Sequence, residues 1–356
     1  MCCRPTACPK VDGDAVKRSA LVFVGPSAVE IVDEECPAPG AGEVLVRARF
    51  SAVSAGTELL AFRGQLPAAL PLDETLPALG AAGFAFPFRY GYASAGVVAE
   101  LGAGVDPGWR GRRVFAFAPH ASAFVVPASE IFAVPEGLAD EAAPLLASAE
   151  TAVNLVLDGR PLLGERVAVF GQGVVGLLAT ALLARFPLAT LIAVEPRAVR
   201  AALAQRLGAT VASDAAAARA ALGEDGADLA FELSGNPAVL DAAIAAVGRE
   251  GRVVVGSFYG GQRAPVDLGE HFHRGRLAIV SSQVSHIAPG LRGRWDRRRR
   301  MAVAWRLLQE IDARALVSHV LPLGQAAAAY RLLAAGDASA LQVLLHHAPC
   351  TMHHAP

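Results

Sequence analysis

One glycine-rich run constrains the fold of this chain more than any other feature. It follows an apolar strand pattern at 166–171, precedes a helical pattern at 177–186, and reads Gly171-Gln172-Gly173-Val174-Val175-Gly176. In such a run the first glycine allows a tight turn, the second lets the backbone approach a pyrophosphate, and the third packs helix against strand. The helix N-terminus adds free N–H groups and the positive end of its dipole. We therefore expect all six residues to contribute to a dinucleotide site.

An acidic residue indicates which dinucleotide is bound. Glu195 ends the next strand pattern, 19 residues after Gly176. A carboxylate there accepts hydrogen bonds from the adenosine ribose and repels a 2′-phosphate, which favours NAD. Arg197 and Arg200 follow closely, and their guanidinium groups could instead accept the 2′-phosphate of NADP. The sequence favours NAD and leaves NADP open.

The second half of the chain alternates strand and helix patterns from about residue 140. This alternation predicts an α/β fold with a doubly wound parallel sheet. Two later strand patterns end in small residues, Ser234-Gly235 and Gly256-Ser257. Ligands of such sheets lie beyond the carboxyl ends of the strands, so we expect these residues to border the nicotinamide half of the cofactor. The run RWDRRRR at 294–300 predicts a solvated helix start.

The first half of the chain has a different pattern. Short strand patterns recur between residues 20 and 60 and again between 93 and 127, separated by turn-forming residues. They predict a β-rich, barrel-like antiparallel domain. The segment 65–88 is rich in Pro, Gly and Ala, which indicates a long loop with a short helix at most. The two ends, 1–18 and 348–356, are expected to be loose tails.

Composition excludes several classes of protein. Apolar residues make up 53% of the 356 residues and charged residues 18%, which excludes a mostly disordered chain. A net charge of −1 gives no electrostatic reason to expect a nucleic acid or an anionic membrane as partner. No cysteine lies between Cys36 and Cys350, so we expect no disulfide framework and a cytoplasmic location. The apolar stretch 167–194 is broken by glycines, a proline and Arg185, and is better explained by strand, turn and helix than by a membrane span.

These features together resemble the medium-chain dehydrogenase/reductase superfamily over about residues 20–346. Besides the glycine-rich run, the resemblance is carried by SAVSAGTE (51–58), YGYASAGVVAELGAGV (90–105), GRRVFAF (111–117) and ETAVNLVL (150–157). The stretch SAVSAGTELLAFRGQLP in particular looks like the bacteriochlorophyllide dehydrogenases of photosynthetic bacteria and their relatives. The resemblance implies a homodimer and three parts: a GroES-like substrate domain at 19–158, a Rossmann domain at 159–314, and a return segment at 315–347.

The chain departs from the zinc-binding members of this superfamily. Ser54 or Ala55 stands where they have a cysteine ligand, Tyr92 stands where they have a histidine, and the third position falls near Ala147 to Glu150. The four-cysteine structural lobe is also missing. Such residues do not make an ordinary catalytic zinc site, which needs three good N, S or O ligands. The expectation is that no zinc is bound.

Without a metal, hydrogen-bond donors must stabilise the reacting oxygen. By resemblance Thr57 occupies the position of the superfamily's proton-relay hydroxyl, and Tyr92 would point into the vacated metal site. Ser54 is a lesser catalytic candidate. Thr57 and Ser54 could instead cap the following helix, and Tyr92 could merely fill space. As substrate contacts we consider Glu58, His120 and Glu150, although a structural role for His120 and a helix-dipole role for Glu150 are the plainer alternatives.

The sequence therefore predicts a zinc-independent, NAD(P)-dependent oxidoreductase acting on a small organic molecule. It would interconvert an alcohol and a ketone, or reduce an activated double bond. One alternative is oxidation of a hydroxyethyl group on a chlorophyll-type macrocycle, which rests on the subgroup resemblance alone. The other is a dinucleotide-binding redox sensor without catalysis, suggested by the loss of the metal ligands.

Overall fold

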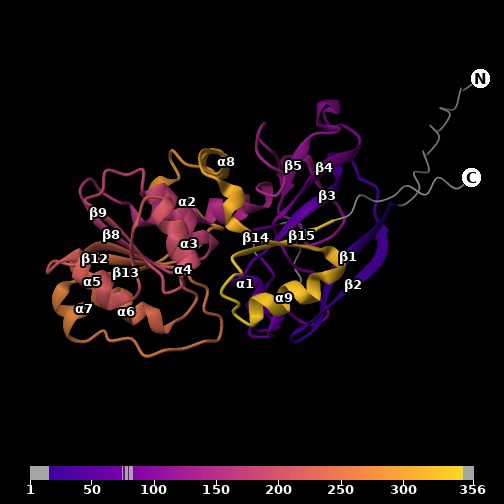
Figure 1. Ribbon diagram of the computed structural model, residues 1–356. Coiled ribbons are helices and arrows are strands. Elements are labelled where there is room, and N and C mark those ends of the chain that lie inside the picture. The colour runs from indigo at the N-terminus through magenta and orange to yellow at the C-terminus, as the bar shows by residue number, and fades with distance from the viewer. Residues whose placement is uncertain (1–15, 74, 77–78, 80–82, 348–356) are drawn as a thin grey trace, which may run out of the picture.

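The computed structural model describes residues 16–73, 75–76, 79 and 83–347. Figure 1 shows a β-rich part built from both ends of the described chain, beside an α/β part built from its middle. The expected tails at 1–15 and 348–356 lie outside the described residues. Strand β1 begins at Val16, so residues 16–18 are paired in a strand and do not belong to a tail.

The β-rich part contains two sheets. A two-stranded ribbon pairs β1 (Val16–Gly25) with β2 (Ala28–Cys36). The main sheet has the order β14-β15-β3-β4-β5-β7, with β6 also paired to β3, and all its pairs are antiparallel except β14 with β15. Its strands are β3 (Glu43–Val53), β4 (Ser94–Leu101), β5 (Arg113–Ala116), β6 (Ala123–Pro127), β7 (Ile131–Ala133), β14 (Val317–Pro322) and β15 (Gln342–His346).

Two helices and a long connection complete this part. Helix α1 (Thr57–Phe62) follows β3, and helix α9 (Ala326–Ala334) lies between β14 and β15. The connection 63–93 contains no α-helix among its described residues. Its aromatic residues pack against β1 and α9, where Phe88 stacks on Phe23 at 5.0 Å between ring centroids. Strand β15 pairs with β3, so the last described segment completes the first sheet.

The α/β part is a six-stranded parallel sheet. Its strands are β8 (Arg166–Phe170), β9 (Thr190–Val194), β10 (Thr210–Ala212), β11 (Ala227–Glu232), β12 (Val247–Val255) and β13 (Ala278–Ser281). Their order is β10-β9-β8-β11-β12-β13. Counted from β8, this is the order 3-2-1-4-5-6 of a Rossmann fold, in which successive strands are added on one side of β8 up to β10 and on its other side from β11 onward. The predicted fold class, an α/β chain with a doubly wound sheet and a separate antiparallel-rich sheet, is confirmed.

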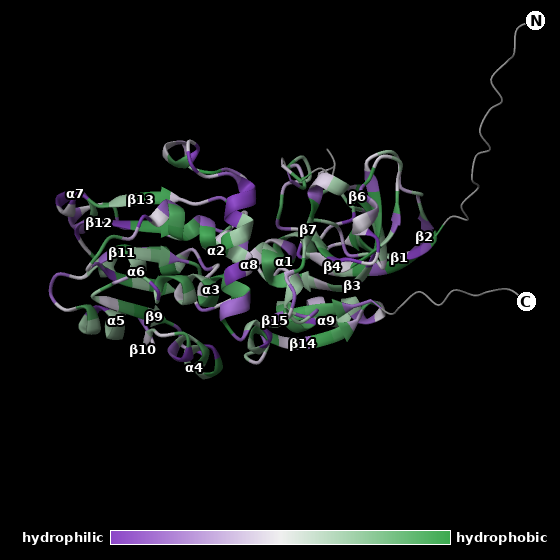
Figure 2. Cartoon of the chain, turned by 90° about the horizontal axis from the view of Figure 1, so that it is seen from above, coloured by the Kyte–Doolittle hydropathy of each residue, from purple (hydrophilic) through white to green (hydrophobic). Residues whose placement is uncertain are grey.

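Helices cover both faces of the parallel sheet, as Figure 2 shows. They are α2 (Leu146–Gly159), α3 (Val174–Leu183), α4 (Ala198–Arg206), α5 (Ala215–Leu222), α6 (Ala238–Ala246), α7 (Glu270–Gly275) and α8 (Arg297–Glu310). Alternate residues of β8 face the two layers. Val167 and Val169 join the core under α2, α3 and α8, whereas Ala168 and Phe170 join the core under α5 and α6. Burial on both faces explains why β8 is apolar throughout.

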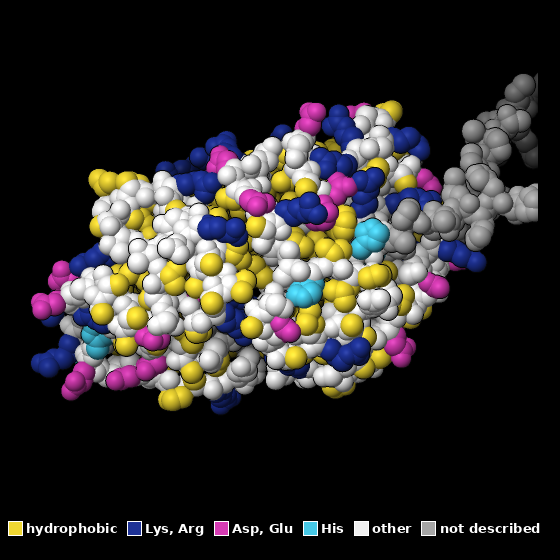
Figure 3. Space-filling model, viewed as in Figure 1, with side chains coloured by type: hydrophobic (Ala, Val, Ile, Leu, Met, Phe, Trp, Pro, Cys, Tyr) yellow, Lys and Arg dark blue, Asp and Glu magenta, His cyan; other side chains and the backbone are white. Residues whose placement is uncertain are grey.

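Other large-scale properties agree with a water-exposed surface. Acidic and basic side chains are interspersed on the face drawn in Figure 3, as the net charge of −1 suggests. Among the described residues, no helix combines the length and the apolar character needed to cross a membrane.

Candidate functional site

The glycine-rich run lies between β8 and α3, at the point where the strand order of the sheet switches sides. Gly171 has φ +89°, and a Cβ atom there would lie 2.6 Å from Cα of Ser234 at the end of β11. A Cβ atom on Gly176 would lie 2.0 Å from the carbonyl oxygen of Gly171. Neither glycine can be replaced without moving the backbone. The turn is therefore drawn tightly against the neighbouring strand and helix.

Gly173 differs from the other two glycines. A Cβ atom there would meet nothing within 4 Å, and the residue is the N-cap of α3 with no side-chain cap. Val174 and Val175 follow as the partly exposed first residues of the helix. Unbonded N–H groups of this first turn thus face open space. This geometry fits an anionic group such as a pyrophosphate.

Glu195 lies beside this turn at the end of β9. Its carboxylate accepts the backbone N–H of Gln172 at 2.9 Å and that of Arg197 at 3.0 Å, and only 5% of the residue is exposed. The side chain of Gln172 is itself buried, where its amide group bonds Val169 and Thr180. Of these two residues, only Glu195 has a side chain available to a ribose at the turn.

Arg200 joins helix α4 to the return segment. The guanidinium group of Arg200 donates to the carbonyl oxygen of Ala340 at 2.7 Å. Its Nε is buried and has no partner among the described residues. Burial lowers the pKa of Arg200, and the nearby charge of Arg197 lowers it further. Arg200 therefore bridges α4 and the segment before β15, with one N–H left to donate.

Small residues and an unpredicted glutamate lie at the ends of the next two strands. The hydroxyl group of Ser257 accepts the N–H of Gly235 at 2.9 Å, which joins the loops that follow β11 and β12. Glu232, fully buried at the end of β11, accepts the N–H of Ser234 at 2.8 Å and the hydroxyl group of Tyr259. Only the position of Glu232 at the end of an apolar strand could have drawn attention to it. The residues Ser234, Gly235, Gly256 and Ser257 thus border one loop cluster beside the glycine-rich turn.

In the β-rich part, three predicted residues come together. The hydroxyl groups of Ser54 and Thr57 lie near the phenol of Tyr92 and lower its pKa, and all three residues are partly exposed. Burial raises the pKa of Tyr92 to about 12, the charge of Glu58 adds to the rise, and the two nearby hydroxyl groups oppose it. The groups of the chain therefore keep this phenol protonated, as a hydrogen-bond donor. Within the described residues no side chain caps α1, so neither Thr57 nor Ser54 has the capping role considered above.

Glu58 and His120 lie behind this hydroxyl cluster and are fully buried. The carboxylate of Glu58 accepts the backbone N–H of Ser54 and bonds Nε2 of His120, each at 2.9 Å, and it also accepts the hydroxyl group of Tyr330. Both residues thus bind other parts of the chain. Their full burial leaves neither side chain facing the open side of the cluster.

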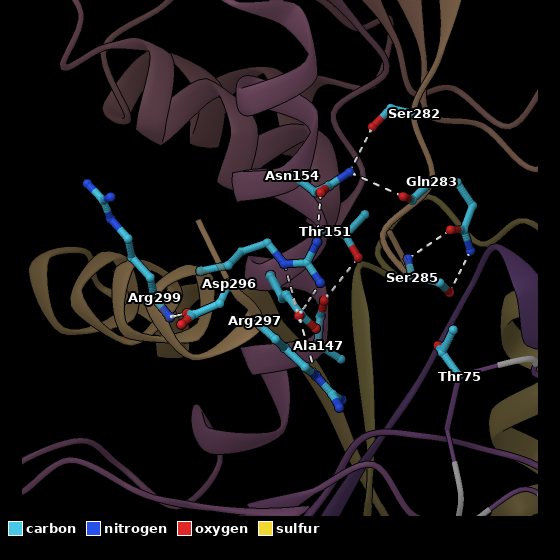
Figure 4. A network of polar contacts seen from close by, with 12 residues as sticks. Thr75, Ala147, Thr151, Asn154, Ser282, Gln283, Ser285, Asp296, Arg297 and Arg299 are labelled. Atoms are coloured by element: carbon cyan, nitrogen blue, oxygen red, sulfur yellow. Dashed lines mark hydrogen bonds and ion pairs between the residues drawn. The ribbon is translucent and has the colours of Figure 1, made fainter. Parts of the chain in front are cut away.

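Glu150 lies within α2 and binds a basic residue that was expected to be solvated. Its carboxylate forms an ion pair with Arg300 of α8 at 2.7 Å, and both residues are 3% exposed. The basic run therefore places one arginine in the core, although its other members lie at the surface or half-buried. Arg300 also donates to Asn154, whose amide nitrogen points toward Ser282 and Gln283 (Figure 4). Burial raises the pKa of Glu150, while the charge of Arg300 opposes the rise.

A cavity of about 460 Å³ opens between the two parts of the chain. It is lined from the β-rich part by Gly64, Gln65, Leu66, Pro67 and Leu70, and from the Rossmann part by Phe258, Gly260 and Gly261. The lining is mostly apolar and contains no charged side chain. Sites between domains of this kind commonly hold small organic molecules.

The residues at the hydroxyl cluster do not fit a catalytic zinc ion. Ser54 and Tyr92 present hydroxyl groups, and Ala147, near the third ligand position, has no donor atom. Zinc sites use thiolate, imidazole or carboxylate ligands. Among the side chains that the structure describes, no three His, Cys, Asp or Glu residues are grouped as metal ligands.

Comparison with known proteins links this architecture to dehydrogenases. A family model described as zinc-binding dehydrogenase matches residues 174–299. D-guloside 3-dehydrogenase of Escherichia coli (strain K12) is 28% identical over 308 residues, covering 81% of this chain and 87% of that protein. (R,R)-butanediol dehydrogenase of Bacillus subtilis (strain 168) is 27% identical over 291 residues, covering 73% and 80%. By these similarities the chain is a dehydrogenase, and it is similar to enzymes of the medium-chain type.

Solved structures agree with this family at the level of the fold. The 2R,3R-butanediol dehydrogenase from Bacillus subtilis superposes with a TM-score of 0.76 at 21% identity, covering 92% of this chain and 99% of that chain. The alcohol dehydrogenase rspB from E. coli CFT073, complexed with NADH, has a TM-score of 0.74 at 21% identity, covering 93% and 99%. These solved structures share the fold expected from the sequence. Membership of a zinc-lacking subgroup and the likeness to bacteriochlorophyllide dehydrogenases stay predictions.

Proposed function

We propose that this dehydrogenase works without a metal and transfers hydride between a nicotinamide cofactor and an oxygen-bearing organic molecule. The observation that carries the proposal is the cluster of Ser54, Thr57 and Tyr92, three hydroxyl groups at positions where the sequence resemblance implies metal ligands or a proton relay in zinc-binding relatives. The substrate would be an alcohol or ketone, or a molecule with an activated double bond. The related proteins include dehydrogenases named for a guloside and a butanediol, which supports an alcohol or sugar-like substrate.

The cofactor would be NAD, bound across the carboxyl ends of β8, β9 and β11. Gly173 and the first turn of α3 would hold the pyrophosphate, because their N–H groups face open space. Glu195 would accept the adenosine ribose hydroxyls, and its negative charge disfavours a 2′-phosphate. The free N–H of Arg200 supports a contact with ribose or phosphate oxygens at the same end. One structurally similar protein is bound to NADP. Paired titrations with NADH and NADPH therefore test the preference for NAD.

Bound nicotinamide would supply or accept the hydride at its C4 atom. The residues of the chain would bind the substrate oxygen and stabilise the negative charge that develops on it. The protonated phenol of Tyr92 and the hydroxyl group of Thr57 would donate hydrogen bonds to that oxygen, which stabilises the negative charge it carries during hydride transfer. The apolar cavity between Leu66 and Phe258 would exclude water and hold the rest of the molecule.

This function is tested by a substrate screen with a matched pair of variants. Purified protein is mixed with NAD or NADH and a panel of alcohols, ketones and enones, and the nicotinamide absorbance is followed. We expect turnover that falls about 100-fold in Thr57→Val, as for loss of one donor to a reacting oxygen, while NADH binding stays unchanged. The control variant Ser285→Ala lies outside the cluster and should keep wild-type turnover. NADH binding without turnover on any substrate would contradict the proposal and favour a dinucleotide sensor.

A further inference from the structure

A buried line of polar side chains lies behind the hydroxyl cluster. Ser51 of β3, Glu58 of α1, His120, Tyr330 of α9 and His347 are each exposed by 2% or less. They come from three regions of the sequence, around residues 51–58, at residue 120 and at 330–347. Burying so many polar groups is costly unless each finds a partner, so their arrangement is informative.

Each carboxylate oxygen of Glu58 has its own task. Oε1 accepts the backbone N–H of Ser54 at 2.9 Å, and this bond closes the turn that carries Ser54 and Thr57. Oε2 is bonded to Nε2 of His120 at 2.9 Å and accepts the hydroxyl group of Tyr330. One oxygen thus holds the turn, and the other anchors the carboxylate to two remote parts of the fold.

The rest of the line supports His120. Its Nδ1 is 2.7 Å from the hydroxyl group of Ser51, which is 2.9 Å from Nε2 of His347. Nδ1 of His347 is buried without a partner in the described part of the chain. Room for the His120 ring depends on Gly91, where a Cβ atom would lie 2.5 Å from its Cδ2.

Only one placement of protons gives every polar hydrogen of this line an acceptor. Burial lowers the pKa of His347 to about 3, so this ring is neutral, and its hydrogen belongs on Nε2 because Nδ1 has no acceptor. Ser51 then accepts from His347 and donates to Nδ1 of His120, whose own hydrogen on Nε2 points at Glu58. The hydrogens of His120 and Tyr330 are then both directed toward the carboxylate of Glu58.

We propose that Glu58 is a positioning residue for the reaction: held by His120 and Tyr330, its carboxylate sets the turn so that the hydroxyl groups of Ser54 and Thr57 meet the phenol of Tyr92. The inference deepens the proposed function and rests on it. Glu58 does not touch the substrate in this account. Its negative charge also faces Tyr92, together with that of Asp73, and keeps the phenol in its donor form.

The first test compares variants that differ only in the bonds made to Glu58. In Glu58→Gln the amide nitrogen cannot accept, so one side of the anchor is lost. We expect kcat to fall on the order of 100-fold, as for a small displacement of reacting groups, with the Kd for NADH unchanged. His120→Gln keeps an N–H near the place of Nε2 and should retain most activity, whereas His120→Leu should resemble Glu58→Gln. If Glu58→Gln fails to fold, the same test is made by comparing kcat and the Kd for NADH between His120→Gln and His120→Leu.

A second readout needs no turnover. Burial raises the pKa values of all four tyrosines, so the titration of Tyr92 is obtained as the difference between the wild type and Tyr92→Phe. Removing the charge of Glu58 should let tyrosinate absorbance appear at lower pH in Glu58→Gln than in the wild type. The comparison is made where circular dichroism shows an intact fold, and Tyr92→Phe identifies the signal.

The outcomes separate the two proposals. If wild-type protein turns over no substrate, the proposed function fails. The effect of Glu58 on Tyr92 is then tested by the tyrosine titration alone. If the titration does not shift, or if His120→Gln and His120→Leu lose kcat and NADH affinity to the same extent, Glu58 has only a packing role and the inference is overturned.

Discussion

Replacing Gly173 by alanine should separate cofactor binding from folding. The residue has φ −67° and ψ −177°, which any amino acid adopts, and a Cβ atom there meets nothing within 4 Å. The folded protein should therefore accept the methyl group, with the free energy of unfolding changed by less than about 0.5 kcal/mol. The methyl group projects into the space that we assign to the pyrophosphate.

The expected loss of affinity follows from that position. A pyrophosphate held off by a methyl group would lose at least one charge-assisted hydrogen bond to the first turn of α3. Such bonds contribute about 1.5–3 kcal/mol, which corresponds to roughly 10- to 150-fold weaker binding of NADH. Gly176→Ala should behave differently, because its Cβ atom would lie 2.0 Å from a carbonyl oxygen. That variant should lose about 1–3 kcal/mol of stability through overpacking.

The assay combines fluorescence titration with NADH and thermal unfolding of the free protein. Gly293→Ala is a suitable control, since a Cβ atom there also meets nothing within 4 Å and the residue lies in the loop before α8. It should change neither quantity. If Gly173→Ala binds NADH as tightly as the control, the pyrophosphate does not lie at this turn, and the assignment of the site is refuted.

Three further outcomes are expected. Exchanging Glu195 for serine should raise the affinity for NADPH relative to NADH, because the charge that repels a 2′-phosphate is removed; an unchanged ratio in paired titrations would contradict its role. Arg300→Met leaves Glu150 buried and unpaired and should cost about 3–5 kcal/mol in urea unfolding, most of which the double variant Glu150→Leu/Arg300→Met should restore. Burial lowers the pKa of His347 to about 3, so between pH 6.5 and 3 protons bind its unfolded form preferentially. Its contribution to the free energy of unfolding should fall by about 1.4 kcal/mol per pH unit on acidification through this range, a slope that His347→Gln should reduce.

Local patterns in the sequence were sufficient to predict the fold of the Rossmann part and the position of its glycine-rich turn. A glycine-rich turn must follow a buried strand and open a helix to work, so Gly171, Gly173 and Gly176 together indicate their surroundings. Glu195 could be placed by counting because one helix and one strand separate it from the turn. The hydroxyl cluster could be predicted for a related reason. Ser54 and Thr57 are close in sequence, and the family resemblance assigns Tyr92 to the same site.

The support behind the cluster could not be predicted in this way. Ser51, Glu58, His120, Tyr330 and His347 are brought together by tertiary folding, and no periodicity links such distant positions. Glu58 and His120 were noticed as single polar residues, but their burial and pairing decide their role. The contact between Ser51 and His347 depends on the pairing of β15 with β3, which only the full sheet topology reveals.

The basic run near residue 300 illustrates a different difficulty. A row of arginines at a helix start normally faces water, and Arg298 and Arg299 do so. Arg300 points inward because Glu150 of α2 lies opposite it, at a distance of 150 residues along the chain. A charge pattern within one helix carries no information on such a partner. The sequence pattern likewise predicts too late a start for β1. Lys17, Arg18 and Ser19 are polar, and they belong to the strand because they pair with β2.

Metal content is the most direct measurement of the central claim. Protein purified without added metal is assayed for zinc in the same sample that is used for turnover with NADH, before and after prolonged chelation. The account predicts zinc far below one ion per chain and turnover that chelation leaves unchanged. One zinc per chain, with activity lost on its removal and restored on its return, would contradict the account.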